Sequence, residues 1–293
     1  MASALPFEIE ELPASFGAVV TGLRLAELDD AGFAALHAAW LDHALLIFPG
    51  QHLSREDQIA FARRIGPLEF ELAPISNVRS DGTLRPDDAS DDVVKILKGN
   101  MGWHQDSTYM PVQAKGAVFT CQVAARPSKF GGGETGFADM RAAYDALDEG
   151  VRARVAGLSA HHSLAYSQAK LGHAHQAGSA YSGYGFDVGE APLRPLVKTH
   201  PETGRKTLAI GRHAYGIPGM DAAESERLLA ELVEAACQPP RVWHHRWTAG
   251  DAVLWDNRCL LHRAMPWDMC EPRVMWHSRV AGDVGTEGVL AQG

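Results

Sequence analysis

One short stretch of the chain, Gly102 to Ser107, contains two side chains that are suited to binding a metal ion. His104 and Asp106 are two residues apart, and a β-strand points such residues to the same side. An imidazole and a carboxylate, joined by a second imidazole from elsewhere, are the protein ligands of non-haem Fe(II) oxygenases. In a chain with 14 histidines this spacing also arises by chance, as a solvated polar pair on a loop. The pair therefore indicates a metal site only if the rest of the chain completes it.

The C-terminal quarter supplies what the pair lacks. His262 follows an expected buried strand and is the candidate third ligand. Another strand begins at Arg273, and its period of two places four side chains on one face: Arg273, Met275, His277 and Arg279. A guanidinium that faces a small-molecule site binds a carboxylate through two points. Taken one at a time, these residues are equally compatible with a buried structural histidine or a surface arginine. Together they indicate an iron site beside a clamp for a carboxylate-bearing co-substrate that chelates the metal.

Composition limits the classes of function. Apolar residues make up 46% of the chain, which is enough for a substantial core, and the net charge of −9 disfavours nucleic acid as a partner. No apolar run has the length of a membrane span, and residues 1–11 show no secretory pattern. The four cysteines show no Cys-x-x-Cys spacing, so we expect unpaired thiols. These features predict a globular cytoplasmic protein.

Apolar spacing and capping residues predict the elements. One helix begins near Asp29 or Asp30, and a second begins at Ser54, where Asp57 stands in the capping-box position. Short apolar runs predict strands at 44–48, 93–96, 117–123, 207–212, 252–255 and 273–280. Further helices are expected at about 139–148, at about 149–157 and after Asp221. Gly131-Gly132-Gly133 predicts a turn that needs positive φ or a close backbone approach.

The order of these elements predicts the fold class. Strands do not alternate regularly with helices, and no Gly-x-Gly-x-x-Gly follows a strand, which disfavours a dinucleotide-binding fold. We expect one domain over residues 1–293, mainly β with helical insertions (α+β), of the β-sandwich type. Residues 79–92 are polar and acidic, and predict either a lid over the site or an ordinary surface loop. Residues 173–190, rich in Gly, Ser and Tyr, predict an irregular excursion.

Three groups of motifs then carry a resemblance. They are Trp103-His104-Gln105-Asp106-Ser107, Gly132-Gly133-Glu134-Thr135, and Trp255-Asp256-Asn257-Arg258 through His262 to Arg273. All are similar to the family of Fe(II)/2-oxoglutarate dioxygenases that contains taurine dioxygenase and 2,4-dichlorophenoxyacetate dioxygenase. The likeness runs from about Phe16 to Asp283. Lys98 to His104, Gly211 to Ala214 and Pro272 to Arg279 most resemble the members that cleave (S)-phenoxypropionates.

The resemblance implies a double-stranded β-helix (jelly-roll) core and an Fe(II) ion held by His104, Asp106 and His262. It implies that Arg273, assisted by Thr135, binds the distal carboxylate of the co-substrate 2-oxoglutarate, with O₂ as the third reactant. The implied reaction hydroxylates the carbon next to the ether oxygen of an aryloxyalkanoate such as (S)-2-(2,4-dichlorophenoxy)propionate. A phenol and pyruvate are then released, together with succinate and CO₂. The resemblance also implies a homo-oligomer.

The chain departs from the family at one position. In the taurine and phenoxyacetate enzymes a second arginine, four residues after the 2-oxoglutarate arginine, binds the anionic group of the substrate, whereas this chain has His277. A small anionic aromatic substrate still needs a partner in a desolvated pocket, and four residues are candidates: Lys98, Arg212, His213 and His277. If 207–213 is a regular strand, Arg212 and His213 point to opposite sides. The two-point geometry of a guanidinium favours Arg212.

Three other functions are compatible with the same residues. An alkyl sulfonate or sulfate ester dioxygenase of the same family would share the chemistry and differ in the substrate. A non-catalytic jelly-roll binding protein would keep the fold and bind neither iron nor 2-oxoglutarate. A zinc hydrolase with the same three ligands would leave Arg273 and Thr135 without a role.

Overall fold

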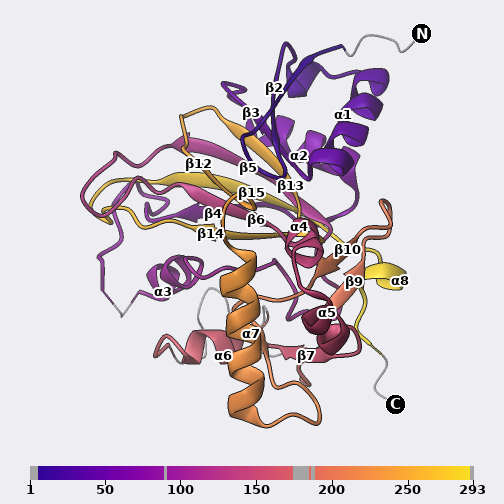
Figure 1. Cartoon of the computed structure of the whole chain (residues 1–293). Coiled ribbons are helices and arrows are strands. Elements are labelled where there is room, and N and C mark those ends of the chain that lie inside the picture. The colour runs from indigo at the N-terminus through magenta and orange to yellow at the C-terminus, as the bar shows by residue number, and fades with distance from the viewer. Residues whose placement is uncertain (1–5, 89–90, 174–184, 186–188, 291–293) are drawn as a thin grey trace.

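A seven-stranded sheet forms the framework of the protein. The computed structural model describes residues 6–88, 91–173, 185 and 189–290. In spatial order the strands of this major sheet are β1 (Glu8–Glu11), β2 (Ala18–Thr21), β3 (Leu45–Phe48), β13 (Ala252–Asp256), β5 (Gly116–Val123), β15 (Val274–Val280) and β4 (Leu68–Ser76). All neighbours are antiparallel except β2 and β3, which are parallel. Strands from the end of the chain therefore lie between strands from its beginning (Figure 1).

Three smaller sheets accompany the major one. The minor sheet contains β12 (Val242–His245), β6 (Thr135–Asp139) and β14 (Leu260–Ala264). The remaining two are β10 (Lys206–Leu208) with β9 (Val197–Thr199), and β11 (Ala214–Tyr215) with β7 (Ser159–His162) and β8 (Leu193–Pro195). Phe119, Trp255 and Met275 of the major sheet share one buried cluster with Phe137 and Leu260 of the minor sheet. The two sheets therefore pack face to face, as apolar side chains on alternate positions require.

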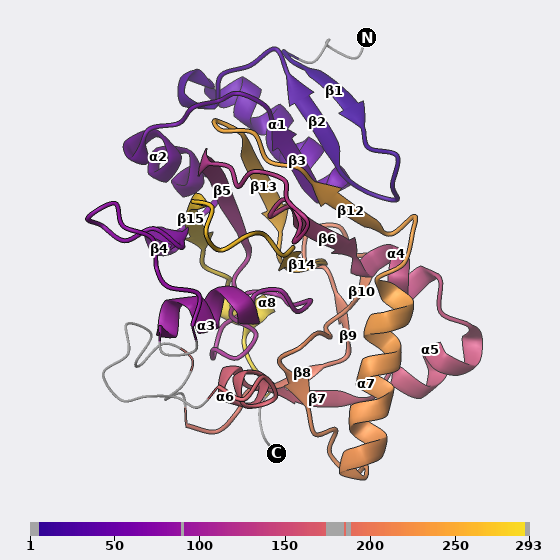
Figure 2. The same ribbon diagram turned by 90° about the vertical axis from the view of Figure 1, so that its left-hand side faces the viewer.

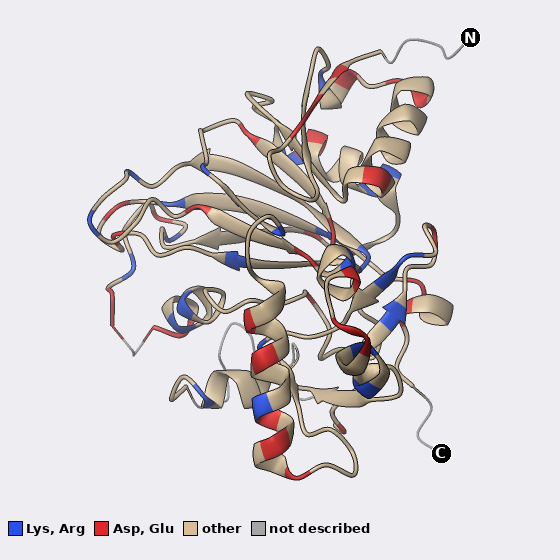
Figure 3. Cartoon of the chain, in the orientation of Figure 1, with Lys and Arg blue, Asp and Glu red and all other residues tan. Residues whose placement is uncertain are grey.

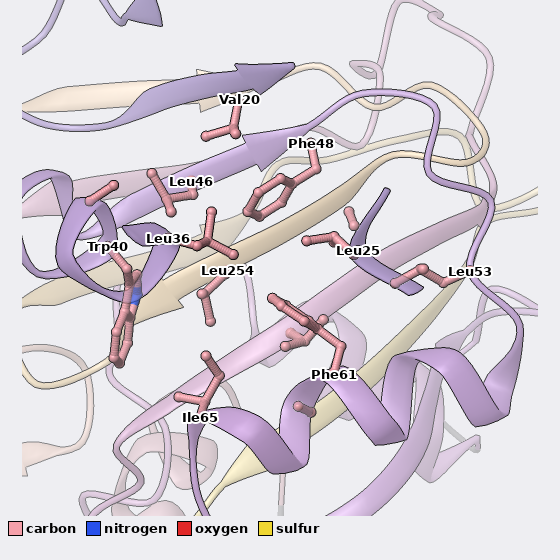
Figure 4. Close-up of a cluster of buried hydrophobic side chains, with 14 of the residues drawn as sticks. Val20, Leu25, Leu36, Trp40, Leu46, Phe48, Leu53, Phe61, Ile65 and Leu254 are labelled. Atoms are coloured by element: carbon pink, nitrogen blue, oxygen red, sulfur yellow. The ribbon is translucent and has the colours of Figure 1, made fainter. Parts of the chain in front are cut away.

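Helices cover the outside of the sheets. They are α1 (Asp30–His43), α2 (Arg55–Ile65), α3 (Asp92–Gly99), α4 (Met140–Asp145), α5 (Glu149–Val155), α6 (Leu164–Ala169), α7 (Ala222–Ala236) and α8 (Val284–Glu287), with a short 3₁₀ helix at Leu25–Glu27. α1 and α2 pack on the major sheet through a buried apolar cluster in which Leu36, Trp40 and Phe61 meet Phe48 and Leu254 (Figure 4). α3 and α6 lie on the other side of the sheets, as Figure 2 shows.

Several predicted elements are confirmed. The Asp29 side chain caps α1 by accepting the amide of Gly32, and Ser54 with Asp57 forms the capping box of α2. The strands predicted at 44–48, 117–123, 252–255 and 273–280 correspond to β3, β5, β13 and β15. The helices predicted near 139–148 and 149–157 are α4 and α5, and the helix after Asp221 is α7. The fold is mixed, with β-sheets at its centre and helices around them, in agreement with the predicted class.

Two predicted strands are wrong. Residues 93–96 belong to α3, because the Asp91 side chain accepts the amides of Val93 and Val94 and starts a helix that buries Val94 and Leu97. β-Branched residues alone therefore gave a misleading signal. The strand predicted at 207–212 ends at Leu208 in the structure. Gly211 then takes φ +129, and the amide of Ala214 donates to its carbonyl, which makes a turn at Arg212 and His213.

The predicted lid and excursion lie partly outside the described residues. Residues 89–90 of the first segment and 174–184 and 186–188 of the second are not described. Acidic and basic residues are interspersed over the outer elements, and α7 carries several acidic residues (Figure 3). Within the described residues, no helix is long and apolar enough to span a membrane.

Candidate active site

The two histidines of the predicted metal site are joined by their backbones. The amide of His104 donates to the carbonyl of His262 at 3.0 Å, and the amide of His262 donates back at 2.8 Å. This isolated antiparallel bridge connects the segment before Asp106 to β14. As a result the two imidazole centroids are 4.2 Å apart, although 158 positions separate the residues in the sequence numbering.

Asp106 completes the group. Its amide donates to Oδ1 of Asn257 at 2.7 Å, and Nδ2 of Asn257 donates to its carbonyl at 3.0 Å. Its carboxylate lies between the two rings, with Oδ1 4.0 Å from Nε2 of His104 and Oδ2 3.8 Å from Nε2 of His262. One ligand atom from each residue lies within 4.8 Å of the others. The structure therefore brings together the three ligands predicted from the sequence.

The protonation states of these residues suit a metal ion. Nδ1 of His104 donates to the carbonyl of Gly102 at 2.8 Å, which leaves Nε2 with its lone pair for a metal. Burial lowers the pKa of His104 to about 3 and that of His262 to about 4, so both rings are neutral at neutral pH. Burial alone would raise the pKa of Asp106, but the Arg279 guanidinium holds it below its ordinary value.

One further observation supports a cation at this place. Oδ2 of Asp106 is buried and has no hydrogen-bond partner among the described protein atoms. A buried carboxylate oxygen without a partner is costly unless a ligand satisfies it. Two neutral imidazoles and one carboxylate, without a thiolate, suit Fe(II). The residues present therefore fit the predicted iron.

A cavity adjoins the three predicted ligands, and it has two walls of different origin. Residues in or next to strands form the sheet wall: Ile75, Phe119, Thr135, Trp255, Arg273, His277 and Arg279. Residues from α3, α6 and the segments near them form the outer wall: Ile96, Asn100, Tyr109, Leu164, Gln168 and His213. Most of the exposed surface of the cavity is apolar, although more than half of its lining residues carry polar groups.

Arg273 is a buried cation that has no carboxylate partner among the described residues. Its Nε donates to the carbonyl of Gly133 at 3.1 Å, and its guanidinium lies 5.1 Å from the ring centroid of Trp267. No carboxylate of a described residue forms an ion pair with it, and burial lowers its pKa to about 10. Gly133 has φ +69, and a Cβ there would lie 3.1 Å from Cδ of Arg273. Because Gly133 lacks a Cβ, the predicted glycine turn leaves room for the side chain of Arg273.

Thr135 lines the same cavity as Arg273. Its Oγ1 accepts a hydrogen bond from the indole Nε1 of Trp247 at 2.9 Å. Because the indole occupies a lone pair of the hydroxyl, the hydroxyl proton remains available to a ligand. A guanidinium and a hydroxyl donor in one apolar cavity form a suitable site for a carboxylate.

The four candidates for binding the substrate anion are not equivalent. His213 and His277 line the cavity. Lys98 pairs with Asp87 at 2.6 Å, and its side chain is 41% exposed. Arg212 lines a different hollow, and its guanidinium donates to the carbonyl of Gly99 and to Gln168. The preference for Arg212 rested on the two-point geometry of a guanidinium, but Arg212 does not line the cavity, and Gly99 and Gln168 already bind its guanidinium.

Sequence reasoning gave no role to three residues that hold the site together. Asn257 fixes the backbone of Asp106, and Oδ1 of Asn77 accepts the amide of Arg273 at 2.8 Å. Arg279 donates from Nη2 to Oδ1 of Asp106 at 3.0 Å. Asn257 stands in a motif that carried the resemblance, whereas the placement of Arg279 on the face of His277 was the only sequence signal for that residue.

A second group of potential ligands has a different explanation. His200, Asp256 and Cys259 are buried close together. Arg258, however, binds both oxygens of Asp256, with Nε to Oδ1 at 2.8 Å and Nη2 to Oδ2 at 2.6 Å. Oδ2 also contacts Nε2 of His200 at 2.9 Å. Both carboxylate oxygens of Asp256 are therefore occupied and neither remains for a metal. The ion pair between Asp256 and Arg258 instead stabilises the turn that leads to β14.

Comparison with known proteins agrees with the geometry of the site. The family described as "Taurine catabolism dioxygenase TauD, TfdA family" matches residues 8–280. This chain belongs to that family. Its relatives include an (S)-phenoxypropionate/alpha-ketoglutarate-dioxygenase from Sphingobium herbicidovorans, 68% identical over 97% of this chain and 98% of the relative. A protein of the same name from Delftia acidovorans is 64% identical over 96% of this chain and 97% of the relative.

Solved structures agree with this assignment to the dioxygenase family. The crystal structure of AAD-2 in complex with Mn(II) and N-oxalylglycine superimposes with a TM-score of 0.87 and 36% identity, covering 98% of this chain and 99% of the other. A taurine dioxygenase from Burkholderia xenovorans gives a TM-score of 0.74 at 26% identity, with 98% and 97% covered. The chain is thus an alpha-ketoglutarate-dependent dioxygenase in sequence and in fold.

Proposed function

We propose that this dioxygenase uses Fe(II), 2-oxoglutarate and O₂ to hydroxylate the ether-bearing carbon of 2-aryloxypropionates, with the (S) enantiomer as substrate. The product breaks down to a phenol and pyruvate, while 2-oxoglutarate becomes succinate and CO₂. The observation that carries the proposal is the placement of the unpaired guanidinium of Arg273 and the His104, Asp106, His262 group in one cavity. The substrate class follows the printed name of the relatives that are 68% and 64% identical.

The sheet wall would hold the co-substrate, on the jelly-roll core implied by the family. Arg273 would bind the distal carboxylate of 2-oxoglutarate through two N–H groups, and the hydroxyl of Thr135 would add a third donor. His104, Asp106 and His262 would hold Fe(II), which when bound supplies the activation of O₂. Burial of these groups excludes water, which strengthens each of the charge contacts.

The substrate would lie between the two walls. Ile96, Tyr109 and Leu164 offer an apolar and aromatic surface to an aryl ring. The carboxylate of the substrate would contact His213 and His277. Nδ1 of His213 lies 2.9 Å from Oγ of Ser167, which leaves Nε2 as its polar atom for a ligand. Nε2 of His277 is buried and has no hydrogen-bond partner among the described protein atoms.

The test supplies 2-oxoglutarate first and O₂ second. Purified protein is loaded with Fe(II) and 2-oxoglutarate without oxygen, exposed to O₂, and given (R)- or (S)-2-(2,4-dichlorophenoxy)propionate in separate reactions. We expect 2,4-dichlorophenol, pyruvate and succinate in equal amounts from the (S) compound. Chromatography measures all three products.

Other outcomes would overturn parts of the proposal. Succinate coupled to taurine or to an alkyl sulfate, without release of phenol, would assign the sulfonate or sulfate ester reaction. Phenol from the (R) compound alone would reverse the enantiomer. Failure to bind Fe(II) or to consume 2-oxoglutarate would make the protein a non-catalytic member of the fold.

A further inference from the structure

Arg279 lies next to the proposed iron ligand Asp106, and nothing in the proposed reaction uses it. It is two residues beyond His277 on β15, so both side chains point into the same cavity. The register of β15 against β4 shifts on each side of Arg279. Its side chain is 9% exposed, and its guanidinium lies 4.7 Å from the ring centroid of Phe70. The cation is thus held in one place.

The guanidinium is connected to the segment that carries Asp106. Nη2 of Arg279 donates to Oδ1 of Asp106 at 3.0 Å, and Nη1 donates to Oγ of Ser107 at 3.2 Å. Ser107 in turn donates to Glu69, at 2.9 Å from its nearer carboxylate oxygen. Ser107 has φ +57, a conformation in which few residues other than glycine are found. The two Nη groups of Arg279 therefore donate to consecutive residues, Asp106 and Ser107, where the backbone bends sharply.

The two oxygens of Asp106 consequently have different surroundings. Oδ1 accepts from Arg279, whereas Oδ2 has no hydrogen-bond partner in the described part of the chain and lies 3.8 Å from Nε2 of His262. His277 approaches Oδ2 as well, at 3.5 Å, but without a hydrogen bond. Oδ2 is therefore the oxygen that is available to a metal.

The number of oxygens that Asp106 donates matters for the reaction. A carboxylate can bind a metal through one oxygen or through two. An iron ion held by three protein ligands would still need room for two oxygens of 2-oxoglutarate and for O₂. A second oxygen from Asp106 would compete for the position that O₂ needs.

We propose that Arg279 is a positioning residue that holds Oδ1 of Asp106, so that the carboxylate binds iron through Oδ2 alone and one coordination position stays open. This inference rests on the proposed metal site. Lysine would not replace it, because a single ammonium cannot hold Asp106 and Ser107 through the two arms of one rigid fork.

The experiment compares Arg279→Met and Arg279→Lys with the unchanged enzyme. We expect the affinity for Mn(II), measured by calorimetry on metal-free protein, to fall by roughly 10- to 100-fold in Arg279→Met, as is typical when a hydrogen bond to a metal ligand is lost. The Mn(II) affinity of Arg279→Lys should lie between those of Arg279→Met and the unchanged enzyme. We also expect the anaerobic Fe(II)–2-oxoglutarate protein to bind nitric oxide, a probe of the open position, more weakly in Arg279→Met, as measured by electron paramagnetic resonance.

Three further variants make the result decisive. Arg154→Met removes an arginine that pairs with Glu224 on the surface, and both affinities should be unchanged. Ser107→Ala removes one contact of the guanidinium and should weaken nitric oxide binding in the same direction, by less. Asp106→Ala should abolish Mn(II) binding, and its failure to do so would refute the metal site itself.

If Asp106→Ala loses Mn(II) while Arg279→Met keeps both affinities, only the role of Arg279 is refuted. A purely structural role would lower the unfolding temperature of Arg279→Met without changing the affinity of the folded protein for either probe. If Arg279→Met does not fold, Ser107→Ala and Arg279→Lys decide: unchanged nitric oxide binding in both refutes the inference.

Discussion

The two walls of the cavity differ in how they are built. The side chains of the sheet wall come from strands or their ends, as Thr135 does at the start of β6 and His277 does within β15. The outer wall comes from short helices and turns, such as the turn that carries His213. A ladder of backbone hydrogen bonds fixes a side chain more firmly than a turn does. The sheet wall should therefore hold its ligand in a more rigid frame than the outer wall does.

The largest effect should come from the proposed metal ligands, which line the same cavity as the two walls. Asp106→Ala removes one of three ligands, so we expect loss of Mn(II) binding beyond the roughly 100-fold that a lost hydrogen bond to a ligand costs. Calorimetry measures the affinity, and Asp30→Ala, which changes an exposed carboxylate, serves as the control. Retained metal binding would remove Asp106 from the ligand set.

On the sheet wall, Arg273→Ala should raise the KM for 2-oxoglutarate. Loss of one partner of a buried charge pair costs about 2–5 kcal/mol, which corresponds to roughly 30- to several-thousand-fold. Iron content should stay nearly unchanged, because Arg273 is not one of the three ligands. Succinate formation against 2-oxoglutarate concentration gives the KM, and an unchanged value would contradict the clamp.

On the outer wall, His213→Ala should act on the substrate alone. One hydrogen bond to a charged group is worth about 1.5–3 kcal/mol, so we expect a rise of roughly 10- to 100-fold in the KM for the aryloxypropionate. The KM for 2-oxoglutarate should not change. A rise in both would show that the two walls are not independent.

Two matched variants sharpen this comparison. Arg212→Met removes contacts with Gly99 of α3 and Gln168 of α6, so it should loosen the outer wall and raise the same KM by a smaller factor. Lys98→Met removes an exposed ion pair with Asp87, and the KM should stay the same.

Stability against acid involves a residue outside both walls. Burial lowers the pKa of His162 to about 3, and neither of its ring nitrogens has a hydrogen-bond partner among the described protein atoms. In the unfolded chain a histidine takes up a proton near pH 6.5, whereas folded His162 does not. Its contribution is therefore complete above pH 6.5 and is lost as the pH falls from there toward 3.

The variant His162→Leu should show a smaller loss of stability in acid. We expect the free energy of unfolding of the metal-free protein to fall less steeply below pH 6.5, by about 1.4 kcal/mol per pH unit. Urea unfolding at pH 7.5, 6.5 and 5.5 measures this. Equal slopes in the two proteins would show that His162 is protonated in the folded state.

The sequence predicted that the candidate ligands and Arg273 lie close together, because these residues sit at fixed spacings in or beside strands. His104, Asp106, His262 and Arg273 all meet at one cavity, as expected. The substrate partners were harder to predict. Guanidinium chemistry favoured Arg212, but only His213 of the two lines the cavity, and both residues follow a turn at Gly211 instead of lying in the expected strand.

The role of Arg279 could not be read from the sequence for a different reason. Its partner Asp106 is 173 positions away, and no local pattern links the two. The helix α3 was missed because its cap, Asp91, outweighs the strand preference of Val93 and Val94. Long-range contacts and caps thus account for most of what the sequence left undetermined.

The paired backbones of His104 and His262 have a consequence for hydrogen exchange. Each of these amides donates to the carbonyl of the other residue, so neither proton can reach solvent until the two segments part. Exchange of the two amides with deuterium in the metal-free protein should therefore give the same free energy of opening. Protection of the His104 and His262 amide protons in metal-free protein would show that the two histidines are already held together before a metal ion binds.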